Sequence, residues 1–354
     1  MKYLLCLLII IVFLFMLVLT IYRSLEENWS ESSLNSEHME MQKNQTAIPE
    51  FLLVGLSSSP EHQMVIFGGF TLIYTAALVV NFLFIFTIGN CSKLHTPMYF
   101  LLVNLSLANM LCISVTIPNM LHTTLVHRKT ISFWGCMAQV YLLLWALGTE
   151  LLLLSFMAFD RYAAICHPLQ YTVIMRKEVH IGVVAGVWMA GSVNSAVHVG
   201  LILRLSFCGS NIINHFFCDL RPLLSLSCSD VSLNETMAYI SDAVFSMGSC
   251  MLTLASYSFI LSAIFRIRSS EGKRKAFSTC SSHLLVVSFY FSTIIYTYIR
   301  PTSVYSQEED KVIAILYSVV TPLLNPLIYS LRNKEVKDEL KKLTHKYTLR
   351  INVR

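Results

Sequence analysis

A few charged side chains inside long apolar runs are the residues best suited to chemistry. Glu150 and Asp242 are each the single acid of such a run. An acid within a membrane-spanning helix is costly and marks a functional site by default. Asp160 and Arg161 are adjacent, so their charges can pair at a membrane edge. These residues suit ligand binding or a conformational latch.

Catalysis is disfavoured by the motifs that the chain lacks. The sequence contains neither His-Glu-x-x-His nor Gly-x-Ser-x-Gly, and it has no inverted pair of broken helices. We therefore expect no enzyme activity, no cofactor and no metal site. The composition also argues against a soluble fold, because 55% of the residues are apolar and 13% are charged, against about 25% charged in ordinary soluble domains.

The elements that must position these residues are apolar helices. A helix needs about 20 residues to cross about 30 Å of hydrocarbon. The sequence predicts an all-α fold, a seven-transmembrane helix bundle, from runs with at most one charge at 64–90, 97–121, 137–159, 181–203, 237–265, 284–299 and 312–331.

Loop charges predict the orientation of these spans. Residues 23–63 hold two basic and seven acidic side chains, whereas 266–275 hold five basic and one acidic. Because Lys and Arg concentrate in cytoplasmic loops, we expect the N-terminus outside and the 266–275 loop in the cytosol. The net charge of +5 is therefore a topology signal and does not indicate nucleic-acid binding.

Four parts are expected along the chain. Residues 4–21 form an apolar run after Lys2, which predicts either a signal-type leader or an anchor, or an extension that a start at Met39 or Met41 would omit. The expected parts are an apolar leader with an acidic extension (1–38), an extracellular N-terminus (39–63), the seven-transmembrane domain (64–331), and a short cytosolic amphipathic helix with a basic tail (332–354).

Cysteines agree with this topology. Four cysteines lie on the expected outer side, and an even number in an oxidising compartment predicts two disulfides with three possible connectivities. They are Cys136, Cys208, Cys218 and Cys228. Among the outer Asn-x-Ser/Thr sequons, which begin at Asn28, Asn44 and Asn234, we favour Asn44 for glycosylation.

Five separated motifs resemble those of rhodopsin-like G-protein-coupled receptors and, more narrowly, of odorant receptors. The resemblance covers about residues 44–343. The motifs are LHTPMYF (94–100), MAFDRYAAICHPL (157–169), HFFCD (215–219), KAFSTCSSH (275–283) and PLLNPLIYSLRN (322–333).

The resemblance implies a receptor that couples odorant binding to a G protein. It implies a stimulatory G protein that raises cyclic AMP, a plasma-membrane location, and cilia of olfactory sensory neurons. It also selects the disulfides Cys136–Cys218 and Cys208–Cys228. The residues that it implies for coupling and switching are Asp160, Arg161, Tyr162, Tyr257, Asn325, Pro326 and Tyr329.

Two departures from the family pattern concern the centre of the bundle. Asn109 stands where the family usually has a carboxylate, so we expect Glu150 to form a polar core cluster with Asn109 and Asn325. The sixth span reads Tyr290-Phe291-Ser292 in place of the usual Phe-Tyr-Gly.

Pro326 removes a backbone hydrogen bond inside the seventh span. We expect Asn325 to satisfy part of the freed backbone.

Two apolar helix faces predict the ligand pocket. Leu143, Leu144, Leu147 and Gly148 share one face by their helical spacing, and the resemblance places this face around the ligand together with Phe291, Ile294, Ile295 and Tyr298. Such a pocket suits small, uncharged molecules, with Tyr298 as a hydrogen-bond donor. Asp242 is open between a pocket position, an outer-loop partner and a protonated packing acid, and a pocket position would favour amines.

Three functions follow as alternatives. The favoured one is an odorant receptor whose partners are a small volatile ligand, a G protein and membrane lipid. A receptor of the same fold for a peptide or lipid is disfavoured by the motifs at 94–100 and 275–283. A membrane enzyme or transporter is the third.

Overall fold

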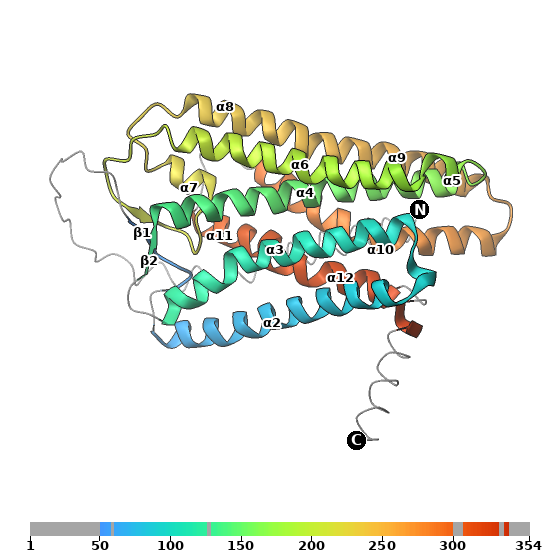
Figure 1. Ribbon diagram of the computed structural model, residues 1–354, viewed down its shortest axis with the longest axis horizontal. Coiled ribbons are helices and arrows are strands. Elements are labelled where there is room, and N and C mark those ends of the chain that lie inside the picture. The colour runs from blue at the N-terminus through green and yellow to red at the C-terminus, as the bar shows by residue number, and fades with distance from the viewer. Residues whose placement is uncertain (1–49, 58–59, 126–128, 300–306, 333–335, 340–354) are drawn as a thin grey trace, which may run out of the picture.

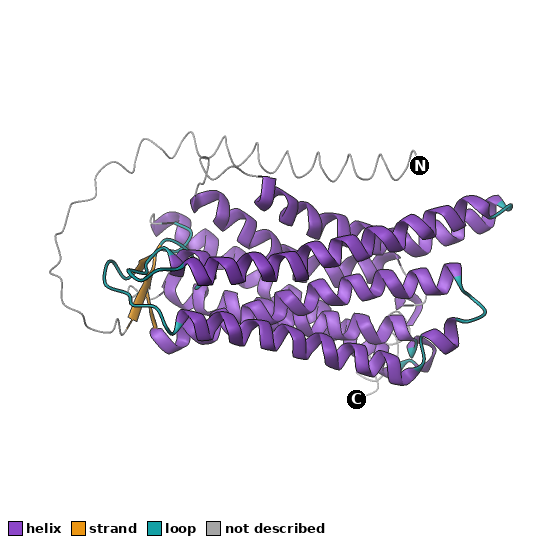
Figure 2. Ribbon diagram, turned by 90° about the horizontal axis from the view of Figure 1, so that it is seen from above, coloured by secondary structure: helices purple, strands orange, loops and turns teal. Residues whose placement is uncertain are grey.

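Seven long helices lie side by side in one elongated bundle (Figures 1 and 2). The computed structural model describes residues 50–57, 60–125, 129–299, 307–332 and 336–339. Five of the helices are single elements: α2 (Pro60–Asn90), α3 (Pro97–Leu125), α4 (Phe133–Cys166), α6 (Lys177–Ile202) and α10 (Ser270–Ile299). The fifth helix of the bundle consists of three consecutive segments, α8 (Ser232–Ser241), η2 (Asp242–Met247) and α9 (Gly248–Arg266). The last helix likewise consists of α11 (Gln307–Ile315), η4 (Leu316–Val320) and α12 (Thr321–Arg332).

The expected seven-helix membrane bundle is confirmed. Six of the described helices are long and apolar enough to cross a bilayer. The remaining helix, α10, which contains the sixth expected span, carries Lys273 and Arg274 in its first two turns, so the charged beginning of the helix precedes the apolar run expected at 284–299. Of the amphipathic helix expected after the seventh span, the structure describes only residues 336–339, which are helical.

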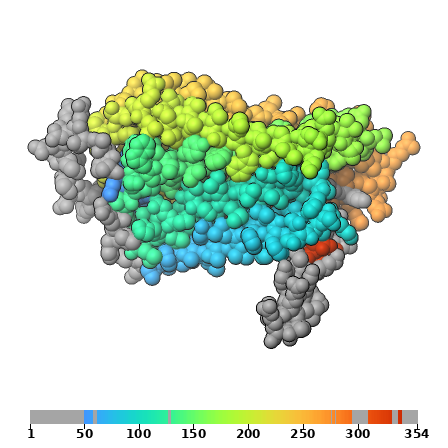
Figure 3. Space-filling model, viewed as in Figure 1, coloured from blue at the N-terminus to red at the C-terminus, as the bar shows by residue number. Residues whose placement is uncertain are grey.

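The central helix of the bundle is α4. It packs against α3, α6, α9 and α10, and its middle is buried on most sides, as Leu153, Leu154 and Met157 are fully enclosed. In contrast, α2 and α6 leave much of their apolar surface exposed, which a bilayer can cover. The space-filling view shows α2, α3 and α6 forming one broad face of the molecule (Figure 3).

Two helices contain a π-helical turn. The segments are η2, which begins at Asp242, and η4, which contains Tyr317. A π-bulge inserts an extra residue into the turn, rotates the residues that follow it, and often occurs at a functional site. The hydropathy pattern had not predicted either segment.

A small sheet caps one end of the bundle, called here the sheet end (Figure 2). Its strands β1 (Glu50–Leu53), β2 (Thr130–Ser132) and β3 (Ile212–Ile213) have the order β2-β1-β3, antiparallel between β1 and β2 and parallel between β1 and β3. Phe51 is fully buried and contacts the rings of Phe133 and Phe207. The sheet thus joins the segment before α2 to the connection between α3 and α4 and to the loop after α6.

The opposite end, called here the Arg161 end, carries shorter connections. A 3-10 turn η1 (Ser92–Leu94) joins α2 to α3, and α5 (Tyr171–Ile174) lies between α4 and α6.

At the sheet end, the loop between α6 and α8 contains the short helix α7 (Leu220–Leu224). The leader expected at 1–38 and the sequon at Asn44 lie outside the described residues.

Candidate functional site

A cavity of about 250 Å3 lies within the bundle near the sheet end. Its wall is formed by residues of α4, α6 and α10, of the continuous segments α8–η2 and α11–η4, and of the loop that contains α7. The lining residues are Leu144, Leu147, Gly148, Leu151, Asn194, His215, Asp219, Arg221, Pro222, Ser241, Asp242, Phe245, Ser246, Tyr290, Thr293, Asp310, Ile313 and Tyr317.

The apolar side of the cavity is a stripe along α4. Leu144, Leu147 and Leu151 repeat at spacings of three and four residues, which places them on one helix face. Gly148 lies within this stripe, where an added Cβ would be 3.4 Å from the Phe245 ring. The absence of a side chain at Gly148 therefore lets the π-helical turn approach α4 closely.

The polar side of the cavity holds three carboxylates from distant parts of the chain. Asp219, Asp242 and Asp310 all line it, accompanied by Arg221 and His215. Asp219 accepts hydrogen bonds from the Leu220 N–H at 2.7 Å and the Tyr317 hydroxyl at 3.4 Å. Burial raises the pKa of the Asp219 carboxyl, and these donors and Arg221 oppose that rise. The cavity is thus apolar on α4 and polar beneath the loop.

Asp242 borders the cavity, as the first of the three alternatives left open by the sequence requires. It lies at the first position of η2 and borders the cavity, and it interacts electrostatically with His198 of α6. Next to it, the Ser241 hydroxyl donates to Asn194 Oδ1 at 2.9 Å, linking α8 to α6. This corner of the cavity is therefore polar.

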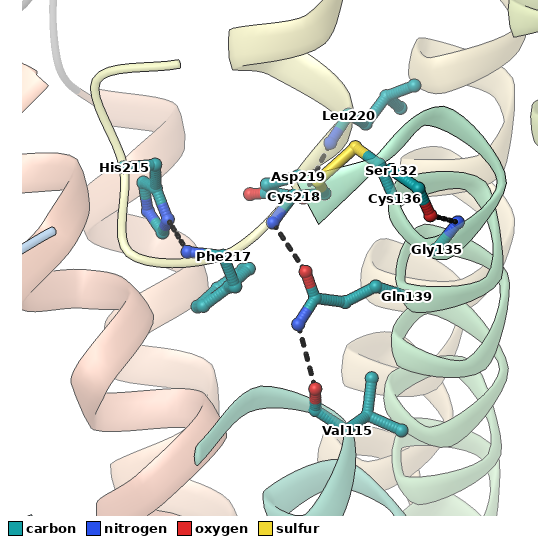
Figure 4. Close-up of a disulfide and its surroundings, with 10 residues drawn as sticks. All are labelled: Val115, Ser132, Gly135, Cys136, Gln139, His215, Phe217, Cys218, Asp219 and Leu220. Atoms are coloured by element: carbon teal, nitrogen blue, oxygen red, sulfur yellow. Dashed lines mark hydrogen bonds between the residues drawn. A yellow bond between two sulfur atoms is a disulfide. The ribbon is translucent and has the colours of Figure 1, made fainter. Parts of the chain in front are cut away.

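The loop over the cavity is pinned by a disulfide between Cys136 and Cys218, whose Cα atoms are 5.5 Å apart (Figure 4). Gln139, one turn after Cys136, accepts from the Cys218 N–H at 2.9 Å and donates to the Val115 carbonyl at 2.8 Å. Its amide therefore joins α4, the loop and α3. Gln139 was not among the residues expected from the sequence, where its signal is an amide side chain one turn after a cysteine.

A second disulfide joins Cys208 to Cys228 within the same loop, with the Cα atoms 5.9 Å apart. The Cys228 N–H donates to the Ser206 carbonyl at 2.9 Å. Both disulfides have the pairing that the family resemblance implies. The loop is thereby closed upon itself and attached to α4, so His215 and Asp219 are held over the cavity.

A chain of asparagines crosses the middle of the bundle. Asn325 Nδ2 donates to Asn109 Oδ1 at 3.1 Å, and Asn109 Nδ2 donates to Asn81 Oδ1 at 3.4 Å. Asn81 Nδ2 donates in turn to the Pro322 carbonyl at 2.9 Å. Pro326 has no N–H to give to the carbonyl four residues earlier, so Asn81 of α2 supplies the missing bond. This differs from the expectation, which assigned that task to Asn325 and did not include Asn81.

Glu150 is not hydrogen-bonded to the asparagine chain, contrary to expectation. It is fully buried in α4, and the Asn109 and Asn325 amides donate to other oxygens. Tyr290 of α10 and Cys112 of α3 are near enough to interact with it electrostatically. The reason is helix rotation: Asn109 faces α2 and α12, whereas Glu150 projects toward α10. Tyr290 also lines the cavity.

The Arg161 end holds the expected charge pair in a loose form. Arg161 Nε and Asp160 Oδ2 are 4.0 Å apart. Asp160 Oδ1 accepts a shorter bond, 2.8 Å, from the Tyr171 hydroxyl of α5. Burial and the adjacent Asp160 carboxylate raise the pKa of Tyr171, which keeps the hydroxyl protonated as a donor. Tyr171, which was not among the residues expected from the sequence, thus ties α5 to the end of α4.

Beside Arg161, a histidine links three helices. Tyr257 of α9 and His283 of α10 are joined by a 2.7 Å hydrogen bond at His283 Nδ1. His283 Nε2 lies 3.0 Å from the Leu154 carbonyl of α4, which can only accept. His283 therefore donates through Nε2 and accepts from Tyr257 through Nδ1. The 275–283 motif contained this histidine, but its partners lie 26 and 129 residues away.

Tyr329, another of the expected switch residues, also lies near Arg161. Tyr329 is buried on α12, and its hydroxyl has no hydrogen-bond partner among the described residues. Arg161 interacts electrostatically with both Tyr329 and Tyr257. Tyr162 projects elsewhere and is hydrogen-bonded at 3.0 Å to His167 Nε2. Arg161 therefore interacts electrostatically with groups on three helices, which are Tyr257 of α9, His283 of α10 and Tyr329 of α12.

Two residues expected in the pocket lie elsewhere. Leu143 is fully buried in a core cluster with residues of α2 and α3, and Phe291 packs into the central core; neither lines the cavity. The reason is again rotation, because α10 presents Tyr290 and Thr293 to the cavity. The side chains of Ile294, Ile295 and Tyr298 lie outside the described part of the structure.

These features define a class of protein. Seven membrane helices, a loop pinned to the third of them by a disulfide, and an Asp-Arg-Tyr motif at the other end of that helix characterise a rhodopsin-like G-protein-coupled receptor. Comparison with known proteins agrees: the family model described as Olfactory receptor matches residues 70–346.

Individual relatives narrow the class to one family. Olfactory receptor 13G1 of Homo sapiens is 48% identical over 300 residues, which are 85% of this chain and 98% of the relative. Olfactory receptor 13A1 of Homo sapiens is 47% identical over 319 residues, 89% and 97% of the two chains. Olfactory receptor 5AP2 of Mus musculus is 49% identical over 310 residues, which are 87% of this chain and 97% of the relative. The chain therefore belongs to the olfactory receptor family, and it is a receptor and not an enzyme.

Proposed function

We propose that this receptor binds a small volatile molecule in the cavity near the sheet end and, in response, activates a stimulatory G protein at the Arg161 end, which raises cyclic AMP. The N-terminus and the sheet end are extracellular in this proposal, with Asn44 glycosylated, and the Arg161 end is cytosolic. The setting that we propose is the ciliary membrane of olfactory sensory neurons.

The cavity is the observation that carries the proposal. Its volume of about 250 Å3 is below the usual range for drug-sized ligands, about 300–1,000 Å3, so it suits a small molecule. The leucine stripe on α4 gives the ligand an apolar wall, where burial contributes roughly 25 cal/mol per Å2. The acceptors beneath the loop suit one polar group on the ligand.

This arrangement refines the expected ligand. The sequence alone favours uncharged molecules, with Tyr298 as their hydrogen-bond donor. Because Asp242 and Asn194 line the cavity, we propose instead that the ligand has an apolar body and one hydrogen-bond donor, such as a hydroxyl or an amine. The donor lies toward Asp242 and the apolar body along Leu144 and Leu147.

Coupling would pass from the cavity to the Arg161 end through α10. Tyr290 borders the cavity, and His283, two turns earlier on the same helix, holds α9 and α4 together near Arg161. A ligand that shifts α10 would strain the bonds at His283. The loose Asp160 pair then leaves Arg161 available for the G protein.

An odorant-panel screen in cells that report cyclic AMP tests the proposal. Gly148→Leu fills the cavity and should abolish the response to an agonist that the screen identifies. Gly186→Leu is the matched control, because Gly186 is exposed on α6 with open space around it. Equal responses from both variants at matched surface expression would contradict the cavity as the ligand site.

A second variant tests coupling separately. Arg161→Ala should reach the cell surface in normal amounts and still lose agonist-driven cyclic AMP, because Arg161 is at the end opposite the cavity. Undiminished signalling at matched surface expression would refute the role that we propose for Arg161.

A further inference from the structure

A second hollow, larger than the ligand cavity, lies at the Arg161 end. It has a volume of about 850 Å3 and is formed by the neighbouring ends of α2, α3 and α6 with η1 and α5. We call it the α3–α6 groove. It is far from the ligand cavity, because α5 and the start of α6 are at the end of the bundle opposite the sheet (Figure 1). One part of its wall is apolar and the other is basic.

The apolar part of the groove opens toward the membrane. Phe100 of α3 and Ile181 of α6 line it and are 40% and 50% exposed. Val103, one turn further along α3, continues the same surface toward the middle of the bundle. Exposed side chains of this kind on membrane helices face hydrocarbon. An occupant with an acyl chain would cover them.

The basic part is the start of α6. Arg176 and Lys177 line the groove and are exposed. The helix begins at Lys177, and Arg176, at the N-cap, makes no side-chain capping hydrogen bond. An N-terminus with free N–H groups and two cations attracts an anion. Glu178 also lines the groove, but it is directed to Arg176, with Nε and Oε2 4.0 Å apart. Lys177 has no ion-pair partner among the described residues.

His180 supplies an independent sign of a ligand. It lines the groove and is 5% exposed. Its Nδ1 lies 2.9 Å from the Arg176 carbonyl, which only accepts, so Nδ1 carries a proton. The other ring nitrogen, Nε2, is buried and has no hydrogen-bond partner among the described residues. A buried polar atom without a partner costs free energy, and a donor on a bound molecule would remove that cost.

We propose that the α3–α6 groove binds an anionic glycerophospholipid of the inner leaflet. The phosphate lies at the start of α6 between Arg176 and Lys177, a headgroup ammonium or hydroxyl donates to His180 Nε2, and an acyl chain covers Phe100 and Ile181. A soluble phosphate would satisfy the basic part alone, whereas a lipid satisfies the basic part, the unpartnered imidazole and the exposed apolar surface together. The proposal rests on the orientation proposed above, in which this end is cytosolic.

Native mass spectrometry of the purified full-length receptor in detergent tests the proposal. The receptor is incubated with equal amounts of phosphatidylserine and phosphatidylcholine, and the retained lipid is counted by mass. We expect selective retention of phosphatidylserine. The double variant Arg176→Gln/Lys177→Gln should reduce that retention about tenfold, since each cation near an anionic lipid surface contributes about 1 kcal/mol and part of this is screened.

The matched control removes the same charge elsewhere at this end. Arg268→Gln/Arg274→Gln alters exposed residues at the connection between α9 and α10 and should leave retention unchanged. Equal losses in the two double variants would show general surface attraction and overturn the proposal, as would undiminished retention in the groove variant. Both variants change exposed side chains, and matching unfolding temperatures confirm that they fold.

Two further arms identify the source of the anion and the role of the histidine. Soluble glycerophosphoserine should not displace the lipid, and displacement at equal concentration would indicate an anion site without a lipid. His180→Phe removes the acceptor and should abolish the preference for phosphatidylserine while phosphatidylcholine is still retained; an unchanged preference would contradict the role of Nε2. None of these readings depends on an odorant or on cyclic AMP, so failure here is distinguishable from failure of the proposed receptor function.

Discussion

The bond from Asn81 to the Pro322 carbonyl permits a prediction in depth. Asn81 is fully buried on α2, and its amide bonds join α2 to α12 and α3. Asn81→Ala would leave the Pro322 carbonyl without this donor, since Pro326 cannot replace it. The two ends of the chain would then be less firmly joined in the middle of the membrane.

The geometry sets the magnitude. Two bonds cross between helices, one of 2.9 Å to Pro322 and a longer one of 3.4 Å from Asn109. Bonds of this kind between membrane helices average about 0.6 kcal/mol and reach about 1.7. Adding the cost of a buried carbonyl without a partner, Asn81→Ala should destabilise the receptor by about 1–3 kcal/mol. Its unfolding temperature should fall by about 2–6 °C.

Thermal unfolding of purified receptor in one detergent, at one scan rate, measures this effect. Asn90→Ala is the control on the same helix, because Asn90 is exposed and its amide donates to the Phe86 carbonyl one turn earlier, within α2 itself. It should change the unfolding temperature by less than about 1 °C, in line with surface substitutions.

A double-mutant cycle isolates the reason. In Pro326→Ala, residue 326 regains an N–H that can donate to the Pro322 carbonyl, so Asn81→Ala should cost about 0.6–1.7 kcal/mol less in that background. Strictly additive effects of Asn81→Ala and Pro326→Ala would refute the idea that Asn81 compensates for the proline. A loss as small as that of Asn90→Ala would refute the importance of the bond itself.

Three more predictions concern the loop and the cavity. Cys136→Ser should abolish surface staining of cells, because the disulfide closes a separation of 82 residues and its removal costs about 2–5 kcal/mol, whereas Cys250→Ser, which alters a free cysteine, should not. The pKa of Asp219 is raised in the folded state, so ionisation of this carboxyl destabilises the fold. The unfolding temperature should therefore fall as the pH rises from the ordinary aspartate range through the raised pKa. Asp219→Asn should flatten this dependence on pH, and an unchanged dependence would contradict the assignment to Asp219. Asp242→Asn keeps an acceptor but removes the charge, so amine agonists should lose potency by about tenfold or more while alcohols keep theirs, and equal losses in dose-response curves would exclude the assigned contact.

The amino-acid sequence by itself determined the membrane bundle. Apolar runs long enough to span a bilayer leave few alternatives to helices, because hydrocarbon offers no partner for backbone polar groups. The family also followed from local motifs, whose residues lie within one helix end or one loop. The pairing of the four outer cysteines came from the resemblance, since residue spacing alone leaves three connectivities open.

Tertiary structure decided which residues meet. Helical periodicity places Leu143 and Leu147 on the same face but does not set the rotation of that face, and packing turned Leu143 into the core. It likewise turned Tyr290 to the cavity in place of Phe291. A shift of one residue rotates a helical side chain by about 100°, so a small difference in packing exchanges a pocket residue for a core residue.

The polar contacts depend still more on the three-dimensional fold. Asn81 and Pro322 are 241 residues apart, and the carboxylates of Asp219, Asp242 and Asp310 come together from a loop and two helices. No local pattern encodes such meetings, because they follow from the registers of helices that touch only after folding. The sequence determined that seven helices cross the membrane. Only the packing of those helices decided that Asn81 of the first helix donates a hydrogen bond to the Pro322 carbonyl of the last.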